Sequence, residues 1–272
     1  PTGEAAQWLN KHYHIPYIIT AHGSDVEGYN QKKYMKIMHK ILKPSWKSIV
    51  RNSNGVVAPS LYLLGLMKKE MQNGDYTLIP NGLDVKKYKT LYSEDFQKEH
   101  RILLMGRMQK SKNFQTILRA ISKIDLQDWK LDILGDGPYR EELERLSKEL
   151  GISDRVNFRG WIDNSSQEQL MYLKKASIYI TASHFENCPM AVLETIAAGC
   201  YPLLSDIPGH RQFIKDNKYF FEMDSEDELA EKVENLIKTN WNDNREFTNI
   251  WDYDWKNIMC KYESLLEMVA RR

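Results

Sequence analysis

Two glutamates, Glu186 and Glu194, lie eight positions apart in the stretch Glu-Asn-Cys-Pro-Met-Ala-Val-Leu-Glu. Pro189 suits the first turn of a helix, where a missing N–H costs no hydrogen bond, and Gly199 suits the helix end. A strand-like run, 177–181, comes just before this stretch. The pattern therefore predicts a strand, then a loop that holds Glu186, then a helix that holds Glu194.

The start of this predicted helix favours an anionic ligand, because its free N–H groups and its positive dipole end point outward. Carboxylates in the same place would rather accept hydrogen bonds from hydroxyl groups than approach a phosphate. A ligand with both phosphates and sugar hydroxyls meets both conditions. The pattern therefore points to a nucleotide sugar.

Two cations follow another predicted strand, which ends at Gly106. Arg107 comes next, and Lys112 stands five residues later at the start of a helix. The sharp turn that Gly106 permits would place both cations at the sheet edge where Glu186 lies. An Arg fork and a Lys point charge can neutralise a diphosphate without a metal. The alternative is a pair of solvated surface cations.

Further candidates follow other predicted strands. The turn at Gly135 and Gly137 allows close backbone approach, but a tight strand-to-helix turn explains it equally well. The backbone at 159–160 could meet a nucleobase, whereas Trp161 is expected in the core. His22 ends the first strand beside a glycine, where it could bond a ligand oxygen; a structural histidine is the alternative.

Several other chemistries find no support in the sequence. No Ser-His-Asp or Cys-His arrangement can be assembled, and no Asp-x-Asp pair sits on a loop near these strand ends, so a divalent ion is not implied. The glycine turn lacks the third glycine of a dehydrogenase fingerprint. The three cysteines have no metal or disulfide spacing, and no signal peptide or membrane-length apolar run is present. We therefore expect a cytoplasmic protein with no cofactor and no metal.

The 272 residues are 42% apolar and 28% charged, enough for a sizeable core. Their net charge of +1 is unevenly spread, because residues 1–98 hold 14 basic and 8 acidic side chains, a net of +6. The remaining residues hold 24 basic and 29 acidic side chains, a net of −5. The two parts are therefore expected to face different partners or surroundings.

Strand-like and helical patterns alternate, which predicts an α/β fold with parallel sheets in two doubly wound domains facing a cleft. The first domain, 1–98, ends in an irregular linker (84–100), and the second covers 99–254. A last helix, 255–272, packs on the second domain or crosses back to the first. The predicted strands are 17–21, 55–59, 76–79, 101–106, 130–134, 156–158, 177–181 and 201–204, and the main helices 4–13, 31–51, 61–72, 113–123, 138–150, 166–175, 190–198 and 226–239.

Four segments occur in one order: 79–84 (Ile-Pro-Asn-Gly-Leu-Asp), Gly106-Arg107 with Lys112, 131–138, and the Glu186/Glu194 pair. This order resembles the retaining GT-B glycosyltransferases of family four, the glycosyl transferases group 1, over about residues 16–255. The resemblance implies two Rossmann-like domains and sugar transfer with retention of configuration. It also implies a UDP- or GDP-sugar donor, a saccharide or lipid-linked acceptor, and no essential metal.

The resemblance also assigns roles. Arg107 and Lys112 would hold the donor diphosphate, Glu194 the ribose hydroxyls and Glu186 the transferred sugar. His22 would lie near that sugar, and Arg159 and Gly160 would meet the base. The remaining donor-binding candidates are Gly106, Gly135, Asn187, Cys188, Pro189, Met190 and Ala191.

The chain departs from the family pattern in two places. No strand with a glycine-rich loop opens the first domain, so we expect that domain to be incomplete and an amino-terminal part to be missing. Gln212 stands where the family usually has a glutamate. A non-catalytic nucleotide-sugar-binding module is therefore kept as an alternative. An epimerase of similar fold would need catalytic acids that cannot be placed.

Residues 32–51 carry seven Lys or Arg and no acidic residue. Tyr34, Ile37, Met38 and Ile41 follow helical spacing, with the lysines roughly opposite. One expectation is a surface helix packed by its apolar stripe, broken or kinked at Pro44. The other is a face that meets anionic lipid at the inner membrane surface. Nucleic acid is a poor alternative because aromatic interleaving and a basic groove are lacking.

Overall fold

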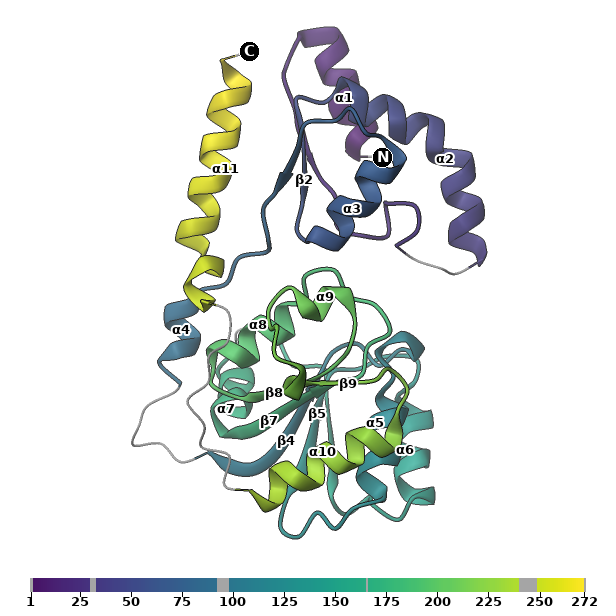
Figure 1. The fold of residues 1–272 in the computed structure, drawn as a ribbon, viewed down its shortest axis with the longest axis vertical. Helices are drawn as coiled ribbons and strands as arrows, with labels where there is room; N and C mark the ends of the chain where they lie inside the picture. Colours follow the sequence, from purple (N-terminus) through teal and green to yellow (C-terminus); the bar gives the residue numbers. More distant parts are fainter. Residues whose placement is uncertain (1, 30–32, 92–97, 165, 240–248, 272) are drawn as a thin grey trace. The chain divides into compact units, whose positions relative to one another are not determined.

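The computed structural model describes residues 2–29, 33–91, 98–164, 166–239 and 249–271. The chain divides into two compact units (Figure 1). The first unit comprises Pro1–Gly82 and Trp251–Arg272, and the second unit comprises Leu83–Ile250. Each unit contains a sheet of parallel strands joined by helices, so the predicted α/β class is confirmed.

The sheet of the second unit has the strand order β6-β5-β4-β7-β8-β9, and every neighbouring pair is parallel. Counted within the unit, this is the doubly wound order 3-2-1-4-5-6, so the connections change direction between β4 and β7. The strands are β4 (Glu99–Met105), β5 (Lys130–Leu134), β6 (Val156–Gly160), β7 (Ala176–Thr181), β8 (Tyr201–Ser205) and β9 (Phe220–Phe221).

Helices cover both faces of this sheet (Figure 1), which explains why its central strands are apolar on both sides. All six residues of β7 are buried. On one face lie α5 (Phe114–Ser122), α6 (Arg140–Glu149) and α10 (Glu226–Lys238). On the other lie α7 (Gln167–Lys175) and α8 (Met190–Ala197). The short helices are η1 (Lys110–Lys112), α9 (Pro208–Arg211) and η2 (Asn217–Tyr219).

The predicted irregular linker is wrong for residues 85–89, which form α4 (Val85–Lys89). Asp84 starts this helix, because its side chain accepts a hydrogen bond from the backbone N–H of Lys87 (3.1 Å). Val85 and Tyr88 are buried, and α4 packs against α8. Residues 92–97 of the same stretch lie outside the described residues. The first part of the predicted linker therefore belongs to the second unit.

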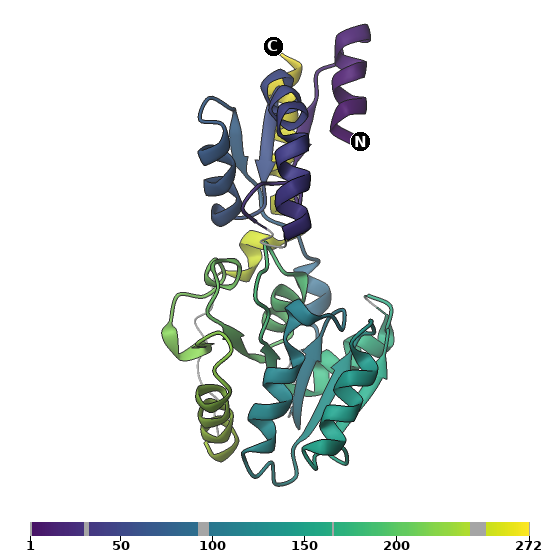
Figure 2. The same ribbon diagram turned by 90° about the vertical axis from the view of Figure 1, so that its right-hand side faces the viewer.

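The first unit has a parallel sheet of three strands: β1 (Ile18–Thr20), β2 (Gly55–Ala58) and β3 (Tyr76–Leu78). Its helices α2 (Lys33–Asn52) and α3 (Leu61–Glu70) cover one face, with α1 (Thr2–Tyr13) packed on α2 (Figures 1 and 2). The turn η3 (Ile250–Tyr253) leads into α11 (Trp255–Ala270). Helix α11 covers the opposite face, where Ile258, Leu265 and Val269 form a core with Val57 and Ile79.

The structure corrects two expectations for α2. The helix runs unbroken through the exposed Pro44, so the predicted break is wrong, whereas a kink there stays a prediction. Its predicted apolar stripe does not pack inward: Ile37 and Ile41 are 61% and 66% exposed. The buried residues of the helix are instead His39 and Val50. The imidazole of His39 lies inward, with its Nε2 2.8 Å from the carbonyl oxygen of Ser24.

Candidate functional site

The loops that follow β4 and β7 meet at the point where the strand order changes direction, the usual ligand position in such sheets. Lys112 Nζ donates a hydrogen bond to Glu186 Oε1 at 2.5 Å. The two side chains are only 24% and 16% exposed. The backbone N–H of His184 also donates to the carbonyl oxygen of Ser111 (3.0 Å). The structure thus places Lys112 beside Glu186, and their roles toward a ligand stay predictions.

The glycine turn after β5 packs against the loop that follows β4. A Cβ atom on Gly135 would lie 2.0 Å from the carbonyl oxygen of Gly106, and one on Gly137 would lie 2.3 Å from that of Met108. The N–H of Gly106 donates to the Leu134 carbonyl (3.0 Å). Close backbone packing therefore accounts for both glycines of the turn without a ligand.

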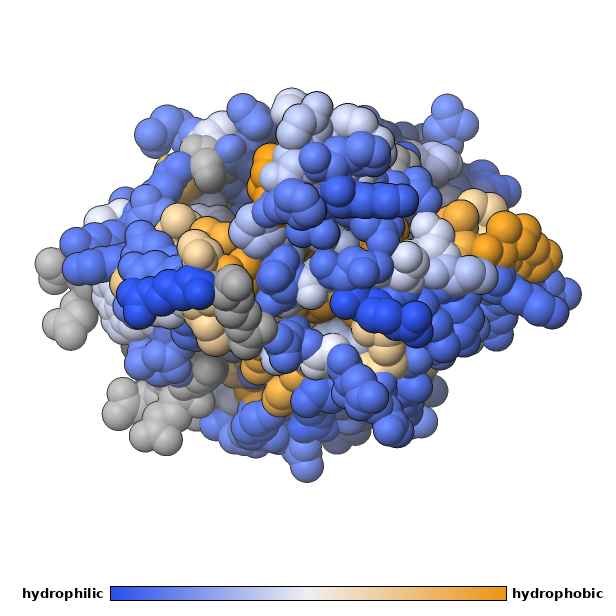
Figure 3. Space-filling model, turned by 90° about the horizontal axis from the view of Figure 1, so that it is seen from above, coloured by the Kyte–Doolittle hydropathy of each residue, from blue (hydrophilic) through white to orange (hydrophobic). Residues whose placement is uncertain are grey.

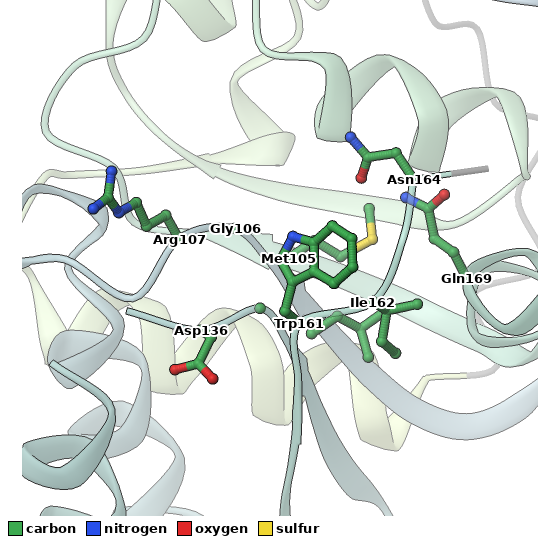
Figure 4. Close-up of a pocket in the computed structure, with 10 residues that line it drawn as sticks. Met105, Gly106, Arg107, Asp136, Trp161, Ile162, Asn164 and Gln169 are labelled. Atoms are coloured by element: carbon green, nitrogen blue, oxygen red, sulfur yellow. The ribbon is translucent and has the colours of Figure 1, made fainter. Parts of the chain in front are cut away.

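A pocket of about 470 Å³ opens beyond the carboxyl ends of β4, β5 and β6 (Figure 4). Figure 4 shows Arg107 at one end and Gln169 at the other, with the Trp161 indole between them. Arg107 is exposed, and within the described part of the chain no hydrogen bond or ion pair to its side chain is formed. The lining residues are Met105, Gly106, Arg107, Leu134, Gly135, Asp136, Trp161, Ile162, Asn164 and Gln169.

The residues that follow β6 differ from expectation. Trp161 is 72% exposed, so its expected place in the core is wrong; the chain leaves the sheet after Gly160 and carries the indole outward. Arg159 lies with its Nε 3.5 Å from Asp132 Oδ1 and its guanidinium over the Tyr172 ring. It does not line the pocket. If residues 159–160 contact a nucleobase, backbone atoms rather than the Arg159 side chain would make that contact.

Glu194 lies on α8 and is buried. Its carboxylate accepts hydrogen bonds from the Tyr88 hydroxyl (3.3 Å) and from Gln169 Nε2 (3.2 Å). Burial raises the pKa of Glu194, and these two hydrogen bonds oppose the rise. Because Gln169 also lines the pocket, Glu194 lies one side chain behind the pocket wall.

Helix α8 begins four positions after Glu186. Pro189 stands at the N-cap, one position before the helix, and has no side chain that could cap the first N–H groups. Asn187 and Cys188 are buried, whereas Met190 and Ala191 are partly exposed. At Asn187 and Cys188 the backbone is therefore the part suited to meet a ligand.

Sequence reasoning missed how α9 supports the loop of Glu186. A Cβ atom on Gly209 would lie 2.1 Å from the Glu186 carbonyl oxygen, so only glycine fits beneath this loop. Gln212 Nε2 donates to the carbonyl oxygens of Asn187 (2.7 Å) and Gly209 (3.1 Å). A carboxylate could not donate these bonds, so a glutamate could not replace Gln212 in this contact.

His22 belongs to the first unit and is exposed directly after β1. The backbone N–H groups of His22 and Gly23 donate to Asp25 Oδ1 at 3.1 and 2.8 Å. This turn fixes the backbone at the strand end. The role of His22 at the transferred sugar stays a prediction.

Within the described residues, no group of three or more His, Cys, Asp or Glu side chains could hold a metal ion. None of the helices in that part of the chain is long and apolar enough to cross a membrane.

Comparison with protein-family models gives two matches. The model described as "Glycosyl transferases group 1" matches residues 92–250, more than half of the chain. The chain belongs to the glycosyl transferases group 1 family. The model described as "Glycosyltransferase Family 4" matches residues 1–87 of this group 1 glycosyltransferase.

Curated relatives of this group 1 glycosyltransferase include one enzyme named for a lipid product and one named for a lipid-linked acceptor. The alpha-monoglucosyldiacylglycerol synthase of Streptococcus pneumoniae is 27% identical over 85% of this chain and 56% of that protein. A Campylobacter jejuni N-acetylgalactosamine-N,N'-diacetylbacillosaminyl-diphospho-undecaprenol 4-alpha-N-acetylgalactosaminyltransferase is 26% identical over 75% of this chain and 54% of that protein. The chain thus spans about half the length of these relatives.

Solved structures share the fold. Anabaena Alr3699/HepE in complex with UDP matches with a TM-score of 0.78 at 15% identity, covering 98% of this chain and 76% of that chain. Sucrose-phosphate synthase from Thermosynechococcus elongatus matches with a TM-score of 0.74 at 19% identity, covering 99% and 72%. The GT-B type of two Rossmann-like domains, predicted from the sequence, is confirmed.

Proposed function

We propose that this group 1 glycosyltransferase moves a sugar from a UDP- or GDP-sugar to a saccharide or lipid-linked acceptor with retention of anomeric configuration. The observation that carries the proposal is the contact between Lys112 and Glu186 at the change of strand direction. A cation and a carboxylate from two different loops come together there, beside the pocket that Arg107 lines.

The cations suit a departing diphosphate. In the transfer, the bond between the anomeric carbon and the diphosphate oxygen breaks and negative charge grows on that oxygen. A bond from the anomeric carbon to an acceptor hydroxyl oxygen forms in its place, and the hydroxyl proton passes to the departing diphosphate. Arg107 has a free guanidinium fork, and Lys112 has three N–H donors, of which Glu186 takes one. Both can therefore bond phosphate oxygens as the charge develops, which is the main catalytic contribution that we propose. We also propose that no metal is essential.

The carboxylates suit hydroxyl groups. Glu186 Oε1 accepts from Lys112, and its second oxygen can accept from a hydroxyl of the transferred sugar. At the other end of the pocket, Gln169, with Glu194 behind it, would bond the ribose hydroxyls, and the exposed Trp161 ring offers a face to the nucleoside. The nucleoside would then lie in the part of the pocket lined by Trp161 and Gln169, and the diphosphate near Arg107.

We further propose that α2 contacts an anionic membrane surface at its cytoplasmic side. The helix exposes Tyr34, Ile37, Met38, Ile41 and Leu42. On a helical wheel these side chains form one arc, and the lysines lie roughly opposite it. Figure 3 shows an apolar patch at the right of the view, where α2 reaches the right-hand edge of Figure 1. Such a face fits a helix lying in the lipid headgroup region.

The names of the two relatives described above support this proposal. One names a lipid product, and the other names a lipid-linked acceptor. An acceptor of this kind would be reached at a membrane surface. We therefore place the reaction in glycolipid or polysaccharide assembly.

The alternative function is a nucleotide-sugar-binding module without turnover. One experiment separates the two: calorimetric titration of the purified protein with a panel of UDP- and GDP-sugars, followed by measurement of slow donor hydrolysis. The transferase proposal predicts binding of at least one donor and its slow hydrolysis to free sugar and UDP or GDP. Binding without any hydrolysis would favour the module, and no binding of any donor would contradict both.

A further inference from the structure

One carboxylate oxygen joins the two loops that carry Lys112 and Glu186. Asp224 Oδ1 accepts a hydrogen bond from Asn113 Nδ2 at 2.7 Å and contacts His184 Nε2 at 2.8 Å. Asn113 directly follows Lys112, and His184 stands two positions before Glu186. The loop after β9, which holds Asp224, thus reaches both loops of the proposed donor site.

The Asn113 side chain has both of its functional groups engaged. Its Nδ2 donates to Asp224, and its Oδ1 accepts from the Thr116 hydroxyl at 3.0 Å. Asn113 is buried, so the amide cannot exchange these partners for water at low cost. The orientation of the residue next to Lys112 is therefore fixed by hydrogen bonds from two sides.

Two residues of this cluster have left-handed backbone conformations that are rare outside glycine. The φ angle is 54° at Asn113 and 66° at Asp224. Such conformations persist where surrounding contacts hold them. The bond between Asn113 and Asp224 connects the two turns directly, so each helps to keep the other in place.

We propose that Asp224 is a positioning residue that holds the Lys112 and Glu186 loops at the spacing that a donor diphosphate requires. This inference rests on the proposed function, because it assigns Asp224 to the same donor site. Asp224 reaches the two proposed ligand-binding side chains only through their neighbours Asn113 and His184. Its effect is therefore confined to the diphosphate end of the ligand.

The test compares Asp224→Ala, Asp224→Asn and the control Asp227→Ala. Asp227 lies three positions further, is exposed, and accepts a hydrogen bond from Lys123. Calorimetry would measure the affinity of each variant for UDP and for uridine, with GDP and guanosine in parallel. We expect Asp224→Ala to bind UDP and GDP about tenfold more weakly than wild type, the size of effect that a charged hydrogen bond has. Its affinity for uridine and guanosine should not change.

Asp224→Asn should recover most of this affinity, because its carbonyl oxygen can still accept both bonds, and Asp227→Ala should bind as wild type. The inference would be overturned if Asp224→Ala bound UDP and GDP as wild type does. It would also be overturned if the variant lost as much affinity for the nucleosides as for the nucleoside diphosphates. If the wild-type protein bound no nucleotide, the proposed function would fail by itself. A crystal structure of Asp224→Ala would then decide on positioning: displaced 110–113 and 184–186 loops support it, and unmoved loops refute it.

Discussion

Among single residues, Lys112 and Glu186 are paired but differ in what they would contact. Lys112 offers donors to phosphate, and Glu186 offers an acceptor to a hydroxyl. Removal of the Lys112 side chain should therefore weaken contact with the phosphates, whereas removal of the Glu186 side chain should weaken contact with the sugar. The sequence predicts both residues at one sheet edge, because the carboxyl ends of parallel strands meet there. Their direct contact is seen only in the structure.

Glu186→Ala should slow sugar transfer by about 10- to 100-fold, the effect of one hydrogen bond to a charged group. The same variant should bind free UDP or GDP at least as well as wild type, because Lys112 is released toward phosphate. Steady-state kinetics and calorimetry would measure the two effects. Glu149→Ala, on an exposed helix surface, is the control. A marked loss of nucleotide affinity in Glu186→Ala would speak against this division of roles.

His210 on α9 should make folding sensitive to pH. It is fully buried, with Nδ1 2.8 Å from the Ser205 carbonyl oxygen, and burial lowers its pKa from 6.5 to about 4. Below pH 6.5 the unfolded chain takes up a proton that the folded protein refuses. The free energy of unfolding should therefore fall as pH drops from 6.5 to 4, by about 3 kcal/mol.

Urea unfolding at several pH values between 7 and 4 would measure this loss. The variant His210→Gln should be less stable at pH 7 but should lose less stability as the pH falls. Equal pH dependence of the two proteins would show that another group is responsible.

At the scale of the elements, the turn after β5 should tolerate no side chain. Gly135 has a φ angle of +135°, and an added Cβ would lie 2.0 Å from the Gly106 carbonyl oxygen. Gly135→Ala should therefore lower the free energy of unfolding by roughly 2–4 kcal/mol. Gly151→Ala is the matched control, because φ is +71° there and nothing lies within 4 Å. It should cost about 1–2 kcal/mol. Equal losses would refute the close packing of the two loops.

Alternating patterns predicted most elements well, since strands buried on both faces and amphipathic helices have distinct periods. The strand predicted at 130–134 is β5 as observed. Helix α4 was missed because five residues are too few to show a period, although Asp84 gave a capping signal. The exposed stripe of α2 could not be predicted, because a period shows that a helix has an apolar face but not what covers it.

The contacts of Asp224 with Asn113 and His184 could not be predicted from the sequence either. Asp224 and Asn113 lie 111 positions apart, and their contact depends on two left-handed turns. Asn and Asp adopt such turns more often than other residues, but many that stand in loops do not. The sequence pattern around His184 indicates no role for it, whereas the structure shows its contact with Asp224.

On the scale of the whole molecule, the uneven charge and the exposed face of α2 predict binding to anionic vesicles. Replacement of Ile37 and Ile41 by Asp should abolish flotation with such vesicles, because it removes apolar contact with the lipid. Replacement of Lys36 and Lys40 by Glu should weaken flotation strongly, since each lysine near the surface adds about 1 kcal/mol.

The control for these variants is Leu61→Asp on α3, where an exposed leucine stands outside the α2 face. It should float as wild type does. Equal flotation of all variants, or none by the wild-type protein, would exclude a lipid-binding role of α2.

Arg107→Ala gives the most direct test of the donor site. Calorimetric titration with UDP and GDP should show a loss of about 1.5–3 kcal/mol in binding free energy, because a charged hydrogen bond to the diphosphate disappears. Arg145→Ala, which removes an exposed arginine of α6, should bind as wild type. Equal nucleotide affinity of Arg107→Ala and wild type would contradict a diphosphate site at the β4 end of this sheet.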